Sequence, residues 1–199
     1  MRRIFRQFTS TRGAGYYARP AASGQTVTDD FNRANSGDLS ANWTPVVDQL
    51  QIVSNSAQPF SGSDATERYS AVTWTANQSS EAKITCAATT DAGAGLGVGV
   101  RYSAADNTGY RLVINGDGEW ELGRMSAGSF TFIASGTTTY SAGAVLKLSI
   151  IGTTLTSTYN GVQIDTRTDA NIATGSPAIV YSSSIASGNI DDWTGRDGL

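Results

Sequence analysis

LKLSIIGTTLTSTYNGVQI, residues 146–164, is the stretch that decides the fold class. Apolar and polar residues alternate in Leu146–Ile150, which indicates a strand with one buried face. The pair Asn160-Gly161 is the one that a type I′ hairpin favours, so the chain turns back here into a further strand. The stretch therefore predicts three adjacent antiparallel strands.

A second hairpin is predicted upstream. The runs Tyr110–Ile114 and Glu119–Leu122 flank the turn residues Asn115–Gly118, which are rich in glycine and in turn-forming polar side chains. Similar short runs recur from Thr26 onward, about a dozen in all, between turn signals. This pattern predicts a sandwich of short strands with no extended helix.

One of these runs has an unusual pattern of glycines. Gly93, Gly95, Gly97 and Gly99 fall on one face of the expected strand, and Leu96, Val98, Val100 and Tyr102 fall on the other. Glycine inside a strand marks a bulge or the close approach of another backbone or a ligand. Two interpretations stay open: tight packing under a loop, or the floor of a groove for a sugar ring, a peptide or the arm of another copy.

Composition excludes several kinds of site. The 199 residues include no histidine, which rules out a Ser-His-Asp triad, a Cys-His pair and a His-ligated zinc within this chain. Cys86 is the single cysteine, and among apolar neighbours it is expected to be a core residue. No apolar stretch approaches the roughly 20 residues that span a bilayer, so no membrane partner is expected.

Charge is distributed unevenly along the chain. Residues 1–24 carry five arginines and no acid, whereas the other 175 residues carry nine basic and seventeen acidic side chains, a net charge of −8. The whole chain has a net charge of −3, which argues against a nucleic-acid partner. The asymmetry predicts an extended basic N-terminal arm, residues 1–24, ahead of a sandwich, residues 25–199.

Three interpretations of the arm compete: a solvated tail, a transit peptide of the mitochondrial type, and an anchor lying across a neighbouring subunit. Composition alone would favour the tail, but we favour the anchor, because the charge asymmetry suggests that the arm meets an acidic partner. The candidate anchoring residues are Arg2, Arg3, Ile4, Phe5, Arg6, Phe8, Tyr16 and Tyr17.

The sequence also resembles a known family. Asp29–Asn35, followed by Leu39 and Asn42-Trp43, is similar to the "DxFNRA…L…W" start of concanavalin-like, laminin-G-like modules. Later fragments continue the similarity over roughly residues 26–195: Gly97–Tyr102, Gly109–Leu112, Leu148–Gly152, Tyr159–Gly161 and Asp191–Trp193. The resemblance implies an all-β, two-sheet antiparallel jelly-roll sandwich of a kind frequent in bacteriophage structural proteins and bacterial surface proteins.

Enzymes of this fold cleave glycosidic bonds with carboxylates in an E-x-D-x-E pattern, which is absent here. The nearest candidates are Glu119 and Glu121, which share one face of a strand beside a turn. We expect them to be surface residues of a hairpin, so no catalytic residue is predicted.

Two binding sites are considered. The resemblance places the first and last strands side by side, where clustered carboxylates could hold calcium: Asp29, Asp30, Asp191 and Asp192. Strand-end solvation is the preferred interpretation, and no cofactor is predicted. The aromatic residues chosen as platforms for a sugar ring are Tyr102, Tyr110 and Trp120.

These observations predict a non-enzymatic phage virion structural protein, a capsid decoration or cement protein, a head fibre or a tail-associated protein. The arm would dock on other virion proteins, capsid or tail subunits, in a symmetric multi-copy assembly, and the sandwich would be displayed outside. The alternative is a carbohydrate-binding module or adhesin that recognises host surface glycans, and a second alternative is a glycan hydrolase.

Overall fold

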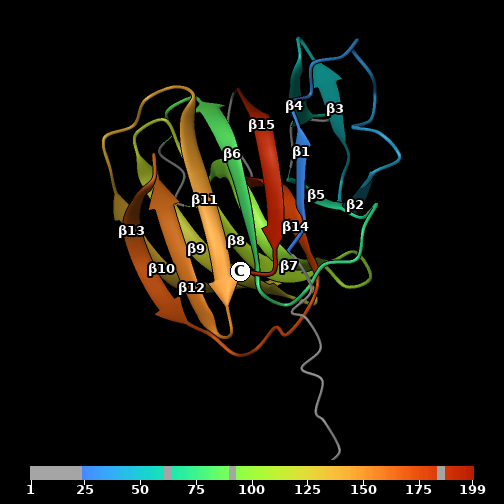
Figure 1. Ribbon diagram of the computed structural model, residues 1–199. Helices are drawn as coiled ribbons and strands as arrows, with labels where there is room; N and C mark the ends of the chain where they lie inside the picture. Colours follow the sequence, from blue (N-terminus) through green and yellow to red (C-terminus); the bar gives the residue numbers. More distant parts are fainter. Residues whose placement is uncertain (1–23, 61–63, 90–92, 183–186) are drawn as a thin grey trace, which may run out of the picture.

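The computed structural model describes residues 24–60, 64–89, 93–182 and 187–199, and all regular structure in them is β-strand. The strands form two antiparallel sheets that pack face to face (Figure 1). The predicted all-β, two-sheet antiparallel sandwich is therefore confirmed. Within the described ranges, no helix has the length and apolar character needed to cross a membrane.

Each sheet combines strands from distant parts of the chain. Sheet A consists, in spatial order, of β13 (Val162–Thr168), β12 (Thr154–Tyr159), β11 (Ala144–Ile151), β6 (Gln78–Cys86), β15 (Gly188–Asp197), β4 (Ser56–Pro59) and β3 (Leu50–Val53), with β1 (Thr26–Asp29) paired to β15. Sheet B consists of β10 (Ser129–Thr137), β9 (Glu119–Ser126), β8 (Thr108–Ile114), β7 (Gly95–Ser103), β14 (Ser176–Ser182), β5 (Ala65–Tyr69) and β2 (Trp43–Val47).

The two predicted hairpins are confirmed. Strands β11, β12 and β13 are consecutive neighbours in sheet A, and β8 and β9 are neighbours in sheet B. Asn160 and Gly161 both have positive φ angles, 49° and 77°, which a type I′ turn requires at its two central residues. Burial alternates along β11, as the period-two pattern predicted.

One predicted face assignment is wrong. The apolar side chains of Leu96–Val100 point into the core between the sheets, but Tyr102 lies on the opposite, outer face of sheet B with Val113. The cause is a bulge in β7, where Arg101 has a φ of 55° and the pairing with β8 shifts. A bulge inserts one residue into the alternation, so the next side chain changes face.

The side chain of Arg101 holds one end of the sandwich together. Its guanidinium donates hydrogen bonds to the carbonyl oxygens of Ala76 at 2.9 Å, Gly152 at 2.8 Å and Ile172 at 2.6 Å. Its backbone N–H donates to Oε1 of Gln78 at 3.0 Å. These carbonyls belong to three different connections, so one buried cation fixes loops that lead into both sheets. Burial lowers the pKa of this guanidinium.

An aromatic cluster also joins the two sheets. The ring of Trp193 on β15 lies 4.7 Å from that of Trp43 on β2 and stacks at 5.3 Å on that of Tyr69 on β5. The indole N–H of Trp193 donates to Oγ of Ser80 at 2.8 Å. Large rings thus fill the core here and satisfy their polar atoms internally.

A carboxylic acid is also buried between the sheets. Glu67 on β5 accepts a hydrogen bond from the backbone N–H of Leu50 at 2.8 Å. Burial raises the pKa of Glu67 from 4.5 to about 7, because the charged form loses its solvation. The folded protein therefore holds this proton at pH values where the unfolded chain has released it.

Replacing Arg101 tests its role as an anchor. Arg101→Met should lower the free energy of unfolding by about 3 kcal/mol, because three carbonyl groups, that of Ile172 buried, lose their charge-assisted hydrogen bonds. Urea unfolding followed by tryptophan fluorescence measures the loss. Arg167→Met is the matched control at an exposed guanidinium paired with Asp165, and it should cost less than about 1 kcal/mol. Equal losses in the two variants would contradict the role of Arg101.

Glu67 should make stability depend on pH. Its folded-state pKa is raised, so its stabilising contribution is complete below pH 4.5 and is lost as the pH rises through about 7. The free energy of unfolding should fall by about 3 kcal/mol between about pH 5 and about pH 8 on account of this group. Glu67→Gln keeps an acceptor for Leu50 and should remove most of that slope in urea unfolding curves. If the pH dependence of the free energy of unfolding persists in Glu67→Gln, it arises from other titrating groups.

Candidate functional site

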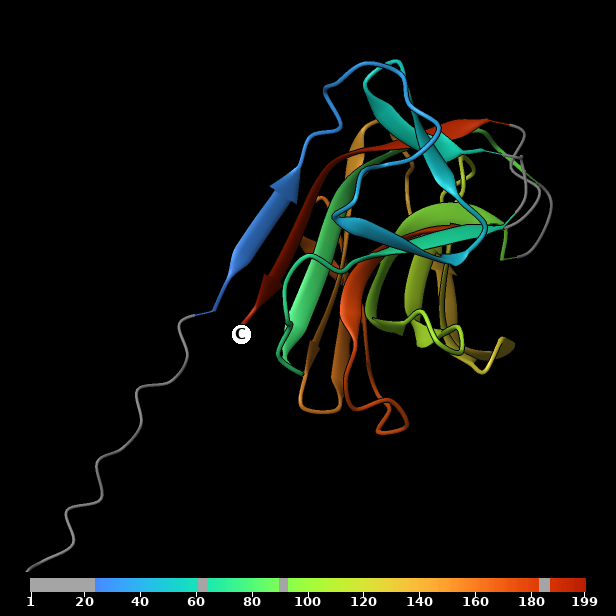
Figure 2. The same ribbon diagram turned by 90° about the vertical axis from the view of Figure 1, so that its right-hand side faces the viewer.

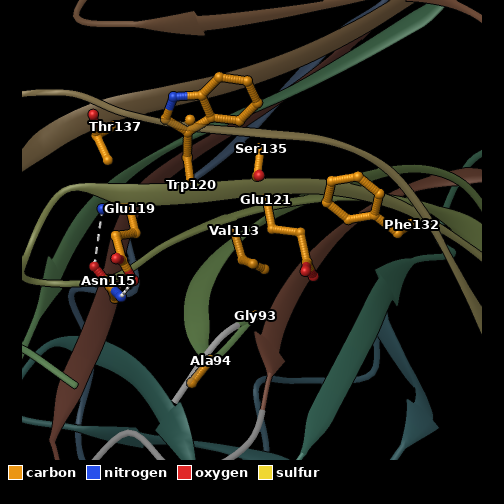
Figure 3. A pocket seen from close by; sticks show the side chains of 11 residues that line it. Gly93, Ala94, Val113, Asn115, Glu119, Trp120, Glu121, Phe132, Ser135 and Thr137 are labelled. Carbon is orange, nitrogen blue, oxygen red and sulfur yellow. Dashed lines mark hydrogen bonds between the residues drawn. The ribbon is translucent and has the colours of Figure 1, made fainter. Parts of the chain in front are cut away.

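The outer face of sheet B is hollowed over β9 and β10 (Figure 3). We name this hollow, with a volume of about 430 Å³, the groove. It is lined by Gly93, Ala94, Val113, Asn115, Glu119, Trp120, Glu121, Phe132, Ser135, Gly136 and Thr137. Carboxylate, amide and hydroxyl groups thus meet apolar surface in one concave site, the combination found in ligand pockets.

The turn between β8 and β9 positions the first carboxylate of the groove. Oδ1 of buried Asn115 accepts hydrogen bonds from the backbone N–H groups of Asp117 and Glu119, both at 3.0 Å. Nδ2 of the same amide donates to Oε2 of Glu119 at 3.2 Å. One asparagine side chain therefore both closes the turn and orients the carboxylate at the end of the groove.

The second carboxylate is held by an arginine on the neighbouring strand. Nη2 of Arg111 on β8 donates to Oε1 of Glu121 at 3.1 Å, and Nη1 donates to Oγ of Ser182 at 2.8 Å. The guanidinium also lies 4.3 Å from the ring centroid of Phe130, a cation–π contact. These partners fix the orientation of Glu121 before any ligand arrives.

Two phenylalanines of β10 are exposed beside these charges. Phe132 has 57% of its surface exposed and Phe130 has 41%, and Phe130 covers the position where a Cβ on Gly123 would lie. The bulge between Phe132 and Ala134 reverses the alternation, so residues on both sides of it can face the groove. Neither ring was predicted as a binding residue from the sequence, although the period-two spacing of residues 130 and 132 was an available signal.

The three aromatic residues chosen from the sequence as sugar platforms are buried. Tyr102, Tyr110 and Trp120 expose 1%, 0% and 6% of their surface. Tyr102 covers Gly99, and the hydroxyl of Tyr110 donates to Oδ1 of Asp169 at 2.7 Å. Trp120 contributes to the lining of the groove, but its indole points to the opposite side of β9 from the two glutamates (Figure 3).

The glycine run serves close packing along most of its length. A Cβ at Gly97 would collide with the carbonyl group of Leu112 on β8, and one at Gly99 would collide with the ring of Tyr102. Of the four glycines, Gly93 is the one that lines the groove. Of the two interpretations left open for the run, close packing therefore applies to Gly97 and Gly99, and only Gly93 contributes to a groove.

Glu119 and Glu121 do share one face of β9, as predicted from their spacing, and both line the groove. Figure 3 shows their side chains directed to the same space. The backbone of Gly93 approaches Glu121 so closely that a Cβ there would lie 2.9 Å from Oε1. The two glutamates were expected to be ordinary surface residues of a hairpin, whereas the structure makes them part of a concave site.

The four aspartates considered for calcium lie at the first and last strands, which pair as the resemblance implied. They are Asp29, Asp30, Asp191 and Asp192. Asp29 accepts hydrogen bonds from Nη1 of Arg33 at 2.7 Å and from the indole N–H of Trp43 at 2.9 Å. Asp192 is paired with Lys83. In the part of the chain that the structure describes, no group of three or more His, Cys, Asp or Glu side chains could hold a metal ion.

The anchoring residues predicted in the arm lie outside the described residues. They are Arg2, Arg3, Ile4, Phe5, Arg6, Phe8, Tyr16 and Tyr17.

No protein-family model matches the chain, and no curated protein does. Solved structures do match. The carbohydrate binding module CBM66 from Bacillus subtilis has a TM-score of 0.65 at 15% identity, over 77% of this chain and 94% of that chain. A Bacillus licheniformis beta-glucanase has a TM-score of 0.59 at 9% identity, over 87% and 98%.

The carbohydrate recognition domain of Emp47p has a TM-score of 0.60 at 11% identity, over 87% of this chain and 95% of that chain. At identities this low, the similarity establishes a shared fold but does not establish a shared activity. The chain has the concanavalin A-like lectin/glucanase jelly-roll fold.

Proposed function

We propose that this protein binds a carbohydrate in the groove and does not cleave it. The observation that carries the proposal is that the exposed ring of Phe132 and the carboxylates of Glu119 and Glu121 line one concave site. A sugar ring presents an apolar C–H face, which packs on an aromatic ring, and hydroxyl groups, which donate to carboxylates. Both kinds of partner are present within a single groove here.

The similar structures support the proposal at the level of the fold. Two of them are by their names a carbohydrate binding module and a carbohydrate recognition domain. The fold also hosts enzymes, so the argument for this chain depends on the groove residues.

A second candidate function is glycan hydrolysis, which the two groove carboxylates favour. Residues at i and i+2 of a strand are about 7 Å apart at Cα, a spacing compatible with the paired acids of glycosidases. However, Glu121 is engaged by Arg111 and Glu119 by Asn115, and the described residues that line the groove include no third acid. Each carboxylate thus already has a protein partner, which suits binding better than proton transfer.

The virion role proposed from the sequence depends on residues 1–24, which lie almost wholly outside the described residues. It stays a prediction, and it is compatible with glycan binding by the sandwich.

Removing the exposed ring should weaken binding. Phe132→Ala should reduce the affinity for a glycan identified on an array roughly tenfold, because the sugar face loses its stacking partner. Titration calorimetry with that glycan measures the change, and the urea midpoint should stay unchanged. Phe60→Ala is the control, since Phe60 is an equally large exposed ring outside the groove. Equal affinity of wild type and Phe132→Ala would remove the groove from consideration.

Hydrolysis is checked on the same glycans. Incubation with the full chain should release no reducing ends above the background of Glu119→Gln and Glu121→Gln proteins. Release by the wild type that both variants lack would make the protein a hydrolase.

A further inference from the structure

We infer that the groove accepts uncharged or amino-bearing saccharides and rejects acidic ones, and that Glu119 is the residue that determines this selectivity. The inference rests on the proposed function and specifies the chemical class of the ligand.

The charges contributed to the groove by described residues are negative. Among the described residues that line it, Glu119 and Glu121 are the two ionisable side chains, and no arginine or lysine is present. Glu121 is neutralised by Arg111 at 3.1 Å. Glu119 accepts a hydrogen bond from the neutral amide of Asn115 and takes part in none of the ion pairs among the described residues. One uncompensated negative charge therefore remains in the groove.

Arg111 is the nearby cation that could neutralise this negative charge or attract an acidic saccharide. Its contacts argue against both roles. Its two terminal nitrogens donate to Glu121 and Ser182, and its face lies against Phe130. Its Nε is buried without a hydrogen-bond partner among the described residues. Arg111 lines a smaller hollow of about 140 Å³ and is absent from the lining of the groove. Its positive charge therefore compensates Glu121 and is not offered to a ligand in the groove.

A ligand's charge would be felt strongly at this position. Charges a few ångströms apart lie well within the screening length of about 8 Å at physiological ionic strength, so salt does not cancel their interaction. A uronate, sialate or sulfate group near Glu119 is repelled, whereas an ammonium group is attracted and a hydroxyl group donates a hydrogen bond. The net charge of −8 on residues 25–199 acts in the same direction.

Glu119 can be changed without removing the elements that build the groove. Its side chain is exposed, and the hydrogen bonds that close the turn run from the backbone N–H groups of Asp117 and residue 119 to Asn115. Substitutions at residue 119 therefore leave these turn contacts in place.

The test uses the full chain on an array of saccharides that differ in charge within matched pairs. The probes are sialylated and desialylated N-glycans, sulfated and unsulfated galactans, pectins of low and high methyl esterification, and chitosan with chitin. The wild type should bind uncharged or amino-bearing members, and in the sialylated, sulfated and pectin pairs it should bind the acidic member at least tenfold more weakly than its partner. Glu119→Gln should reduce this ratio, and Glu119→Lys should reverse it.

Asp38→Lys is the matched control, because it makes the same change of charge at an exposed site on the connection between β1 and β2. It should leave every ratio within twofold of the wild type. Wild-type binding of acidic members as tight as that of their uncharged partners would overturn the inference and leave the proposed function standing. Equal changes of the binding ratio in Glu119→Lys and Asp38→Lys would likewise overturn the inference and leave the proposed function standing. If the wild type binds no saccharide, the proposed function fails and the inference fails with it.

Discussion

The burial of one guanidinium group shapes both the interior and the outer face of this sandwich. Arg101 can reach the carbonyl oxygens of three connections because the backbone of β7 adopts a left-handed conformation at this residue. The same bulge turns Tyr102 outward, where it packs with Val113 and Val180. Burying a cation is costly unless its donors are satisfied, so the carbonyls and the bulge depend on each other. The hydrophobic cluster on the outer face of sheet B is a consequence of that arrangement.

The groove residues are restrained before a ligand arrives. Asn115 holds Glu119, and Arg111 holds Glu121, with distances of 3.1 to 3.2 Å. Side chains that are already ordered lose little conformational entropy on binding, which favours affinity for a weakly apolar ligand such as a sugar. The same restraint limits proton transfer, because each carboxylate oxygen that is held by a protein donor is less available to a substrate.

Features that depend on local sequence could be predicted, and those that depend on distant contacts could not. Alternation predicted β11, and Asn160-Gly161 predicted the hairpin, because both signals depend only on residues adjacent in the sequence. The placement of Glu119 and Glu121 on one face followed from the two-residue period of a strand. The face of Tyr102 could not be predicted, because no side-chain pattern marks the bulge that precedes it.

Aromatic exposure was the least predictable property of the site. A tryptophan or phenylalanine in an alternating strand has the same local pattern whether its ring lies in the core or on an outer face. Trp120 is buried because β9 presents it to sheet A, while Phe132 is exposed because β10 lies at the end of sheet B with a bulge. Which face is covered depends on the packing of complete sheets, so a single strand's sequence does not reveal it.

The pairing of the first and last strands has a consequence for attachment. Thr26 lies opposite Arg196 in sheet A, so the two ends of the described chain leave the molecule side by side (Figure 2). The groove opens on the outer face of the other sheet. Tethering through either end, to a surface, a particle or a fused domain, would therefore leave the groove accessible on the far side of the sandwich.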